Sequence, residues 1–355
     1  MNNYWNLSED QKRIVLQQAS IKIGLPVESV EKDLWVTAIL QCVFSLPYAD
    51  KFVFKGGTSL SKVWNRIERF SEDIDLAIDR SQFGLEGDLT VKQIKTLRKE
   101  SSLFVKEQVA ADLTKVLEAS GLLQWCEVKP EEDGEGDRTY PEPRKIFVKY
   151  TPLMPIAAGY VKPVVMLEIG SRSLFEPYEC RKVNSLVSLA TAIETSVQDV
   201  DIPTAVPEKT FLEKAYLIHE LFSTDAGARV DRKSRHLYDL ERMMDCDFAK
   251  SAITDDDLWN TIHHHRKVFT HMKDVDYTPN IRGRIVLLPP ANIKDAWKTD
   301  YEAMRRTMIY GQSVPFDELL ARMDELQMRF RNRYLELSGS GGIDTYIDWA
   351  CKASD

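Results

Sequence analysis

The chain has 355 residues, a length that accommodates two or three domains of ordinary size. Hydrophobic residues make up 43% and charged residues 29%, which are the proportions of a folded globular protein and exclude a disordered chain. Because 47 Lys and Arg face 55 Asp and Glu, the formal charge is −8. This balance excludes a surface that is basic throughout, but it permits a local basic groove.

Targeting and redox signals are absent from the sequence. No run approaches the ~20 apolar residues of a membrane helix, and the start MNNYWNLSEDQKR does not resemble a signal peptide. The five cysteines are odd in number, widely scattered and free of CxxC pairs. We therefore expect a cytoplasmic protein with reduced thiols and no membrane segment.

The first half of the chain mixes helix and strand signals. Ser8 followed by Gln11 makes a capping box that predicts a helix at 8–23, and Ser29 is the expected cap of the next helix. The alternation of Asp73-Ile-Asp-Leu-Ala-Ile78 is typical of a half-buried strand. The other predicted elements are a strand at 51–54, a helix at 58–64, a helix at 91–120, a polar loop at 129–143, and strands at 146–150 and 164–169.

After about residue 180 the pattern becomes helical. A soft boundary falls at 180–205, where PTAVPE is predicted to be a connector. We predict an α+β protein with a lobe at 1–195, in which helices flank a small mixed sheet, and a mostly helical lobe at 196–355. The predicted helices of the second lobe are 208–223, 235–246, 256–273, 291–309, 315–334 and 343–352.

Asp73 and Asp75 are the most informative residues of the predicted strand. Alternate side chains of a strand share a face, so both carboxylates point to one side while Ile74 and Leu76 point to the other. Two like charges this close repel each other, and a bound divalent cation removes that cost. Hard oxygen ligands suit Mg²⁺, with Mn²⁺ as the alternative. A solvated strand edge is the non-functional interpretation of the same pair.

The segment 55–62, KGGTSLSK, has the composition of an anion-binding turn. Its two glycines let the backbone approach a phosphate, and the helix that follows offers unpaired N–H groups. It is not a Walker A loop, because G-x-x-x-x-G-K-[ST] is absent. Followed by the acidic pair, it predicts a site for a nucleoside triphosphate (NTP) and a metal. The candidate nucleotide-binding residues of this segment are Gly56, Gly57, Thr58, Ser59 and Lys62.

These motifs resemble the nucleotidyltransferase superfamily related to DNA polymerase beta, in which an apolar-Gly-[Gly/Ser] turn precedes Asp-x-[Asp/Glu]. More narrowly, most of the chain resembles the AbiEii/AbiGii (MenT-like) toxins of bacterial type IV toxin–antitoxin systems. The segments that carry the resemblance are VEKDLWVT (30–37), FKGGTSLSK (54–62), SEDIDL (71–76), TFLEKAYLIH (210–219), SRHLYDL (234–240) and AWKTDYEAMR (296–305).

The resemblance implies catalytic roles for residues outside the acidic pair. Lys214 would be a ligand of the nucleotide phosphates, and Asp239 would position Lys214 or the nucleotide. Glu168 would join Asp73 and Asp75 as a third carboxylate, either completing the metal site or taking the proton from the attacking hydroxyl.

Each of these three residues also has an ordinary alternative role. Lys214 would be a surface lysine, Asp239 would form an i,i+4 pair with Arg235 on a helix surface, and Glu168 would pair with Arg172.

Two further features are weaker. The resemblance makes Ser71 a nucleotide contact or a point of modification, while the alternative is a hydroxyl that closes a turn. Arg235 belongs to the basic stretch 229–242, which would hold an RNA backbone or the triphosphate unless it is a solvated helix face. Consecutive helical residues point in different directions, so we expect the tract His263–His265 to lie on the surface and to bind no metal.

The function implied by the resemblance is a Mg²⁺-dependent transfer of NMP from an NTP to an RNA acceptor, the 3′ end of tRNA. Growth arrest or aborted phage infection would follow, and a separate AbiEi-like antitoxin would counteract the toxin. The first lobe would carry the first two nucleotidyltransferase motifs (54–62 and 71–76). The second lobe would carry the third and fourth motifs (210–219 and 234–240). The alternatives are AMP transfer to a protein side chain and a non-catalytic nucleotide- or RNA-binding module.

Overall fold

The computed structural model describes residues 3–136, 139–155 and 161–339, so the helix predicted at 343–352 lies outside the described residues. The chain forms two compact units. The first comprises Met1–Asn65 and Phe70–Ala205, and the second comprises Arg66–Arg69 and Val206–Asp355. The chain therefore leaves the first unit and returns to it between two of the predicted motifs. Strands and helices together confirm the α+β class.

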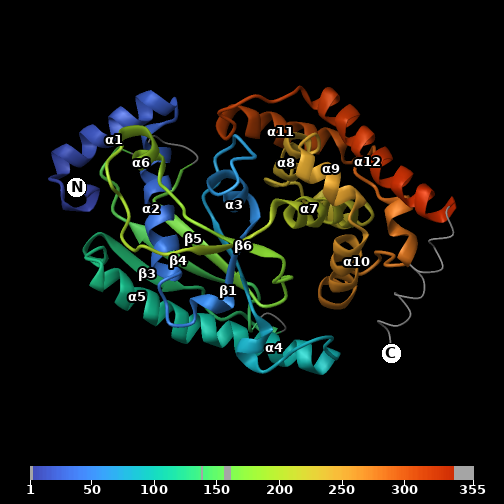
Figure 1. Cartoon of the computed structure of the whole chain (residues 1–355), viewed down its shortest axis with the longest axis horizontal. Coiled ribbons are helices and arrows are strands. Elements are labelled where there is room, and N and C mark those ends of the chain that lie inside the picture. Colours follow the sequence, from blue (N-terminus) through green and yellow to red (C-terminus); the bar gives the residue numbers. More distant parts are fainter. Residues whose placement is uncertain (1–2, 137–138, 156–160, 340–355) are drawn as a thin grey trace. The chain divides into compact units, whose positions relative to one another are not determined.

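The first unit is built on one seven-stranded mixed sheet (Figure 1). The strand order is β3-β4-β5-β2-β1-β7-β6, and the β2–β5 and β1–β7 pairs are parallel. Its strands are β1 (Phe52–Lys55), β2 (Ile74–Ile78), β3 (Cys126–Pro130), β4 (Arg144–Tyr150), β5 (Val164–Gly170), β6 (Tyr178–Arg181) and β7 (Ile202–Ala205). Its helices are α1 (Glu9–Ile23), α2 (Val27–Val43), α3 (Gly56–Lys62), α4 (Val91–Leu103), α5 (Ala110–Ala119) and α6 (Leu186–Thr191).

The sequence does not predict β3, β6 and β7, so the sheet is larger than expected. β3 and β6 are the two edge strands, and all four residues of β6 are exposed, so β6 lacks the burial pattern that identifies a half-buried strand. β7 lies in the segment predicted as the connector PTAVPE, and that prediction is wrong for residues 203–205. Tertiary pairing with β1 makes this short segment a strand.

Local signals predict some element boundaries and miss others. The capping box of Ser8 and Gln11 is present, and Gly24 ends α1 in the left-handed conformation. Ser29 is not a cap, because α2 begins at Val27 and buries Ser29 within its first turns. The helix predicted at 91–120 contains a π-helical segment at 104–109, between α4 and α5.

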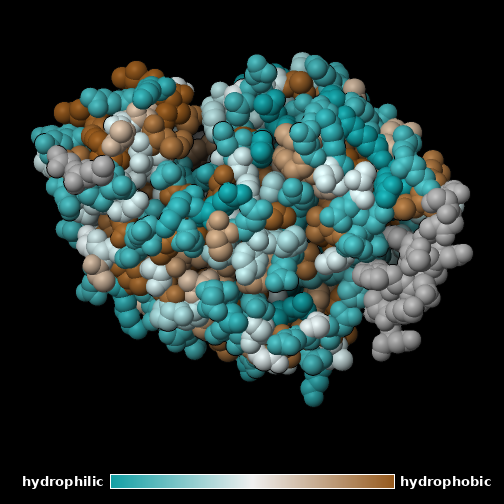
Figure 2. All heavy atoms as spheres, viewed as in Figure 1, coloured by the Kyte–Doolittle hydropathy of each residue, from teal (hydrophilic) through white to brown (hydrophobic). Residues whose placement is uncertain are grey.

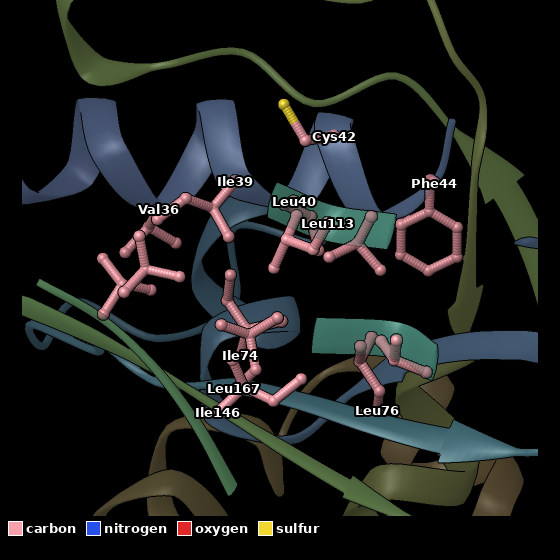
Figure 3. Close-up of a cluster of buried hydrophobic side chains, with 14 of the residues drawn as sticks. Val36, Ile39, Leu40, Cys42, Phe44, Ile74, Leu76, Leu113, Ile146 and Leu167 are labelled. Carbon is pink, nitrogen blue, oxygen red and sulfur yellow. The ribbon is translucent and has the colours of Figure 1, made fainter. Parts of the chain in front are cut away.

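The main core of the first unit lies between the sheet and two helices, α2 and α5 (Figure 3). Ile74 and Leu76 of β2 project into it, as the alternation predicts, and meet Ile39 and Leu40 of α2 and Leu113 of α5. The alternate residues of β2, including Asp75, therefore face the other side of the sheet. A much smaller apolar cluster of Val53, Ala77 and Ala205 occupies that side.

Helix α2 carries three consecutive buried charges, Glu31, Lys32 and Asp33. Lys32 forms a 2.5 Å ion pair with Glu72, and Asp33 pairs with Lys62. Buried charges destabilise a fold unless they are paired, so these contacts hold α2 in a defined position against the segments that carry the Gly-Gly and Asp-x-Asp motifs.

One face of the first unit gathers exposed apolar side chains over α1 and α6 (Figure 2). Ile14 and Ile21 stand seven residues apart on α1, so they share a face of that helix, and Leu189 lies on α6. α1 and α6 pack against each other.

The second unit is helical and is organised around α7 (Pro207–Phe222). Pro207 occupies its first turn, where the missing N–H costs nothing. Its core includes an aromatic cluster of Phe211, Tyr216, Trp259 and Phe330. The remaining α-helices of this unit among the described residues are α8 (Arg235–Met243), α9 (Asp247–Thr254), α10 (Asp256–His265), α11 (Lys294–Thr307) and α12 (Phe316–Gly339), of which the sequence does not predict α9.

We predict that Lys32→Met lowers the free energy of unfolding by about 3–5 kcal/mol, because Glu72 loses the cation that offsets its burial. Urea unfolding measures the change. The control is Lys115→Met, which removes an exposed pair with Asp112 and should cost less than about 1 kcal/mol. Equal losses in the two variants would show that the buried pair does not stabilise the unit.

Candidate active site

Four charged residues form one row across the sheet of the first unit. Lys55 of β1 is the register partner of Asp75 on β2, and Asp75 is in turn the partner of Glu168 on β5. Glu168 is the partner of Lys145 on β4. Register partners on neighbouring strands lie on the same face, about 5 Å apart. The row therefore places two carboxylates side by side and a lysine at each end.

Within the described part of the chain, neither central carboxylate forms an ion pair shorter than 3.9 Å. The Lys145 ammonium forms an ion pair with Glu168, in which Nζ lies 3.9 Å from Oε2. Burial raises the pKa of Glu168, and the charges of Asp75 and Asp73 raise it further, while Lys145 and Lys55 act in the opposite direction. The raised pKa expresses first the cost of burying the Glu168 carboxylate and then the cost of placing it beside Asp75. The alternative partner Arg172 pairs with Glu142 instead.

Gly56 makes the position of the Asp75 carboxylate possible. Its φ is +79°, in the left-handed region that favours glycine, and a Cβ at this position would lie 2.1 Å from Asp75 Oδ2. The Gly-Gly pair is not a turn before the helix, as the sequence suggests, because α3 begins at Gly56 itself. The first glycine is therefore required by the acidic residue beside it as well as by the backbone.

Thr58 ties the two motifs together. Its hydroxyl donates to the main-chain oxygen of Asp73 and lies 2.9 Å from the Ser71 hydroxyl. Thr58 is buried, while Asp73 and Ser71 are half-buried. The structure thus brings Ser71, Thr58, Asp73 and Asp75 together at the start of β2 and the start of α3.

Two of the predicted nucleotide ligands have contacts within the fold. The Ser59 hydroxyl donates to the Gly56 carbonyl at 2.9 Å, and the Lys62 ammonium pairs with Asp33 of α2. The N-cap residue of α3 is Lys55, and its side chain does not cap the N–H groups of the first turn, which include that of Gly57.

A buried ion network lies within the second unit. Asp239 of α8 has no exposed surface and accepts two hydrogen bonds from Arg69, from Nε at 2.7 Å and from Nη2 at 2.8 Å. The ammonium of Lys214 on α7 lies 2.9 Å from the same carboxylate. Asp239 is therefore not a surface carboxylate paired with Arg235; it holds Lys214, which is one of the two placements implied by the resemblance.

The network shifts the pKa of each member. Burial alone would raise the pKa of Asp239, but Arg69 and Lys214 outweigh it and hold the pKa well below its usual range. Burial lowers the pKa of Lys214, with Asp239 acting against the shift. His236 Nδ1 lies 3.4 Å from Lys214 Nζ, and burial together with that ammonium holds the pKa of His236 well below its usual value. The imidazole is thus neutral beside the lysine at neutral pH.

The basic stretch 229–242 has several contacts within its own unit. Arg242 pairs with Glu68, and Lys233 donates to the carbonyl of Ala226. Arg235 begins α8 and is half-buried.

The histidine tract does not lie on the surface as predicted. His263 is 5% exposed and its Nδ1 lies 2.9 Å from the Tyr216 hydroxyl, and His265 is 7% exposed. Because the tract lies on a helix that packs against α7, two of its three side chains turn inward. Only His264 between them is not fully buried.

Sequence reasoning misses three residues that the structure brings to these groups. Arg69 is not singled out, although it stands two residues before Ser71. Lys55 and Lys145 are not singled out because their place beside the carboxylates follows from strand register. The available signals in the sequence are the position of Lys55 directly before the Gly-Gly pair and of Lys145 directly before the predicted strand 146–150. Cations at these positions can neutralise carboxylates on neighbouring strands.

The donor set of the row fits a hard divalent cation. Carboxylate oxygens are the ligands that Mg²⁺ prefers, and the raised pKa of Glu168 reports a repulsion that a cation relieves. Among the residues that the structure describes, no three His, Cys, Asp or Glu side chains are already arranged as a metal site. The fit therefore rests on the neighbouring carboxylates of Asp75 and Glu168.

A mixed sheet with an acidic row beside a Gly-Gly helix start is the arrangement expected of a nucleotidyltransferase, and the comparison with known families shows this class. The family described as nucleotidyl transferase AbiEii toxin, type IV TA system, matches residues 38–322. The chain belongs to this family of nucleotidyltransferase toxins, which confirms the resemblance indicated by the motifs. Membership implies a nucleotide substrate and an antitoxin partner. No curated protein matches the chain.

We predict that Gly56→Ala and Gly84→Ala each cost about 1–2 kcal/mol of stability, because both positions have positive φ. Only Gly56→Ala should also abolish nucleotidyl transfer, because its Cβ displaces the Asp75 carboxylate, whereas a Cβ at Gly84 meets no atom within 4 Å. Urea unfolding and transfer of label from a radiolabelled NTP measure the two effects. Full activity in Gly56→Ala would contradict the role of Asp75.

We predict that Asp239→Asn lowers the free energy of unfolding by about 3–5 kcal/mol at pH 7, because Arg69 and Lys214 lose their counter-charge. The folded pKa of Asp239 lies below the unfolded value of about 3.9, so its stabilisation is present above that value and is lost as the pH falls further.

The difference between the native protein and Asp239→Asn should therefore shrink below about pH 4. Urea unfolding at pH 7, 5, 4 and 3 measures it. Asp247→Asn, at a fully exposed position, is the control and should show little difference at any pH. A difference that stays constant down to pH 3 would refute the assignment of the pH dependence to Asp239.

Proposed function

We propose that this toxin transfers a nucleoside monophosphate from an NTP to an RNA acceptor, the 3′ end of tRNA, in a Mg²⁺-dependent reaction. The observation that carries the proposal is the row that places Glu168 beside Asp75, with Asp73 directly before the strand that holds Asp75. A degenerate nucleotide-binding module has no need of repelling carboxylates at this position, and the family is one of nucleotidyl transferases.

In the proposed reaction, the 3′ hydroxyl of the acceptor attacks the α-phosphorus of the NTP. A new P–O bond forms, the bond from the α-phosphorus to the bridging oxygen breaks, and pyrophosphate leaves. Bound Mg²⁺, or Mn²⁺ in its place, would offset charge on the phosphates and lower the pKa of the attacking hydroxyl. Asp73, Asp75 and Glu168 are the residues that would hold it.

The proton of the attacking hydroxyl needs an acceptor. The raised pKa of Glu168 favours this role over that of a simple counter-charge, because a base works best when its pKa approaches the working pH. Glu168 is therefore proposed either as the third ligand or as the base. We propose that the N–H groups at the start of α3 bind the phosphates. Lys214 of the second unit is proposed as a nucleotide ligand on the resemblance alone.

The acceptor and the biological outcome rest on the family. Blocking the 3′ end of tRNA would stop aminoacylation in the cytoplasm, so growth would arrest or phage infection would abort. An AbiEi-like antitoxin would antagonise this outcome. AMP transfer to a protein uses the same nucleotide chemistry, so the nature of the labelled product separates it from the tRNA proposal.

None of the helices among the described residues combines the length and the apolar character that crossing a membrane requires.

The test is incubation with each radiolabelled NTP, Mg²⁺ and total tRNA, followed by separation of RNA from protein. We expect label on tRNA with at least one NTP, its loss in EDTA, and a decrease of about a thousand-fold in Asp73→Ala. Asp73→Ala should also abolish growth arrest on expression.

The matched control is Asp79→Asn, directly after the same strand, which should keep both activities. Label on protein alone would support AMP transfer. Growth arrest by Asp73→Ala, or no label on any macromolecule, would overturn the mechanism.

A further inference from the structure

A cavity lies in the first unit beside α1 and α2, apart from the carboxylate row. Tryptophans supply much of its wall, and the polar groups are those of Tyr4, Glu9, Lys12, Glu31 and Thr151. The lining residues used below are Tyr4, Trp5, Lys12, Glu31, Trp35 and Trp125.

The walls are suited to a flat ring. Trp5 packs edge-on to Trp35 with ring centroids 5.2 Å apart, and it faces Trp125 at 6.4 Å with a tilt of 26°. Three indoles from separate segments of the chain thus converge on one cavity. Such surfaces bind planar rings by stacking, and nucleobases stack on them with little dependence on sequence.

Lys12 is a buried cation without a carboxylate partner among the described residues. The residue is 5% exposed, and its Nζ lies 4.0 Å from the ring centroid of Trp125 and 5.8 Å from that of Tyr4. Ring faces stabilise an ammonium less than a carboxylate does, so burial lowers the pKa of Lys12. An anionic group in the cavity would supply the missing partner.

Among the described residues, the other polar groups of the cavity form no close ion pair with Lys12. The charge of Glu9 acts against the lowering of the pKa of Lys12, but the Glu9 carboxylate pairs with Arg13 at 3.0 Å. Tyr4 is 1% exposed, and its buried hydroxyl has no hydrogen-bond partner among the described residues. The two carboxylate oxygens of Glu31 accept the N–H groups of Leu153 and Met154, at 2.7 and 3.2 Å. The Glu31 carboxylate is therefore occupied by the backbone and forms no ion pair with Lys12.

We propose that this cavity is a second nucleotide site, in which the base lies against the indoles and the phosphate pairs with Lys12. The choice of a nucleotide among flat anions rests on the nucleotide chemistry of the proposed function, but binding here requires neither metal nor transfer. The occupant is a free mononucleotide or one nucleotide of a single-stranded RNA, which share this chemistry.

The site lies on the opposite side of the sheet from the carboxylates. Trp35 belongs to the core on the α2 side, whereas Asp75 faces away from that core. α2 nevertheless links the two, because Glu31 lines the cavity while the next residue, Lys32, pairs with Glu72, directly before Asp73. A nucleotide bound in the cavity would therefore contact Glu31, which is adjacent on α2 to Lys32, the ion-pair partner of the residue that precedes Asp73.

Tryptophan fluorescence in EDTA, with excitation at 295 nm to spare the nucleobases, tests the proposal. AMP, GMP, CMP and UMP are titrated beside their nucleosides. We expect saturable quenching by at least one mononucleotide, with affinity at least tenfold weaker in Lys12→Gln but unchanged for the matching nucleoside. Trp125→Leu should weaken both. Lys99→Gln, which removes an exposed lysine 5.7 Å from the Tyr140 ring, should change neither.

A short single-stranded RNA, titrated in the same way, identifies the source of the nucleotide. Tighter, Lys12-dependent quenching by RNA assigns the site to an RNA nucleotide, and quenching by mononucleotides alone assigns it to a free one. Trp125→Phe, with a thermal midpoint near that of the native protein, keeps the ring and should retain binding if Trp125→Leu fails to fold.

Asp73→Ala should bind mononucleotides at the second site as the native protein does, so a loss of transfer does not affect the binding result. Conversely, absence of binding at the second site does not contradict the proposed transfer reaction. No saturable quenching by any mononucleotide or RNA, or equal affinity in Lys12→Gln, would overturn the second site.

Discussion

The repulsion between Asp75 and Glu168 is the constraint on which the active-site half of the first unit depends. Parallel pairing of β2 with β5 forces the two carboxylates into neighbouring register, and burial strengthens the interaction. Lys55 and Lys145 flank the pair, and Gly56 lacks the Cβ that would collide with Asp75. Because the repulsion between the two carboxylates is relieved when a cation binds between them, this arrangement favours metal binding. A metal-dependent nucleotidyltransferase requires such a site.

Both units hold buried charges in small closed networks. In the first unit, consecutive charges of α2 pair with Glu72 and Lys62, next to the two motifs. In the second, Arg69 and Lys214 share the carboxylate of Asp239. Such pairs add little net stability over apolar packing, but breaking one is costly, so they fix side chains in place. Positioning of functional groups is the use that this protein makes of them.

Much of the fold and part of the candidate site could be predicted from the sequence. Alternation in 73–78 and the capping box at Ser8 are local signals, and the structure agrees with both. The edge strand β6 could not be predicted, because all its residues are exposed and its pairing with β7 is tertiary. For the same reason His263 and His265 could not be recognised as buried, since the partner helix α7 is distant in the chain.

By itself the sequence determined the acidic pair, the Gly-Gly helix start, the family and the α+β class, because these depend on residue type and short spacing. Tertiary structure alone decided that Glu168 stands beside Asp75, that Arg69 and Lys214 converge on Asp239, and that three tryptophans meet around Lys12. Each of these joins residues far apart in the chain, and strand register and helix packing, which no local pattern encodes, bring them together.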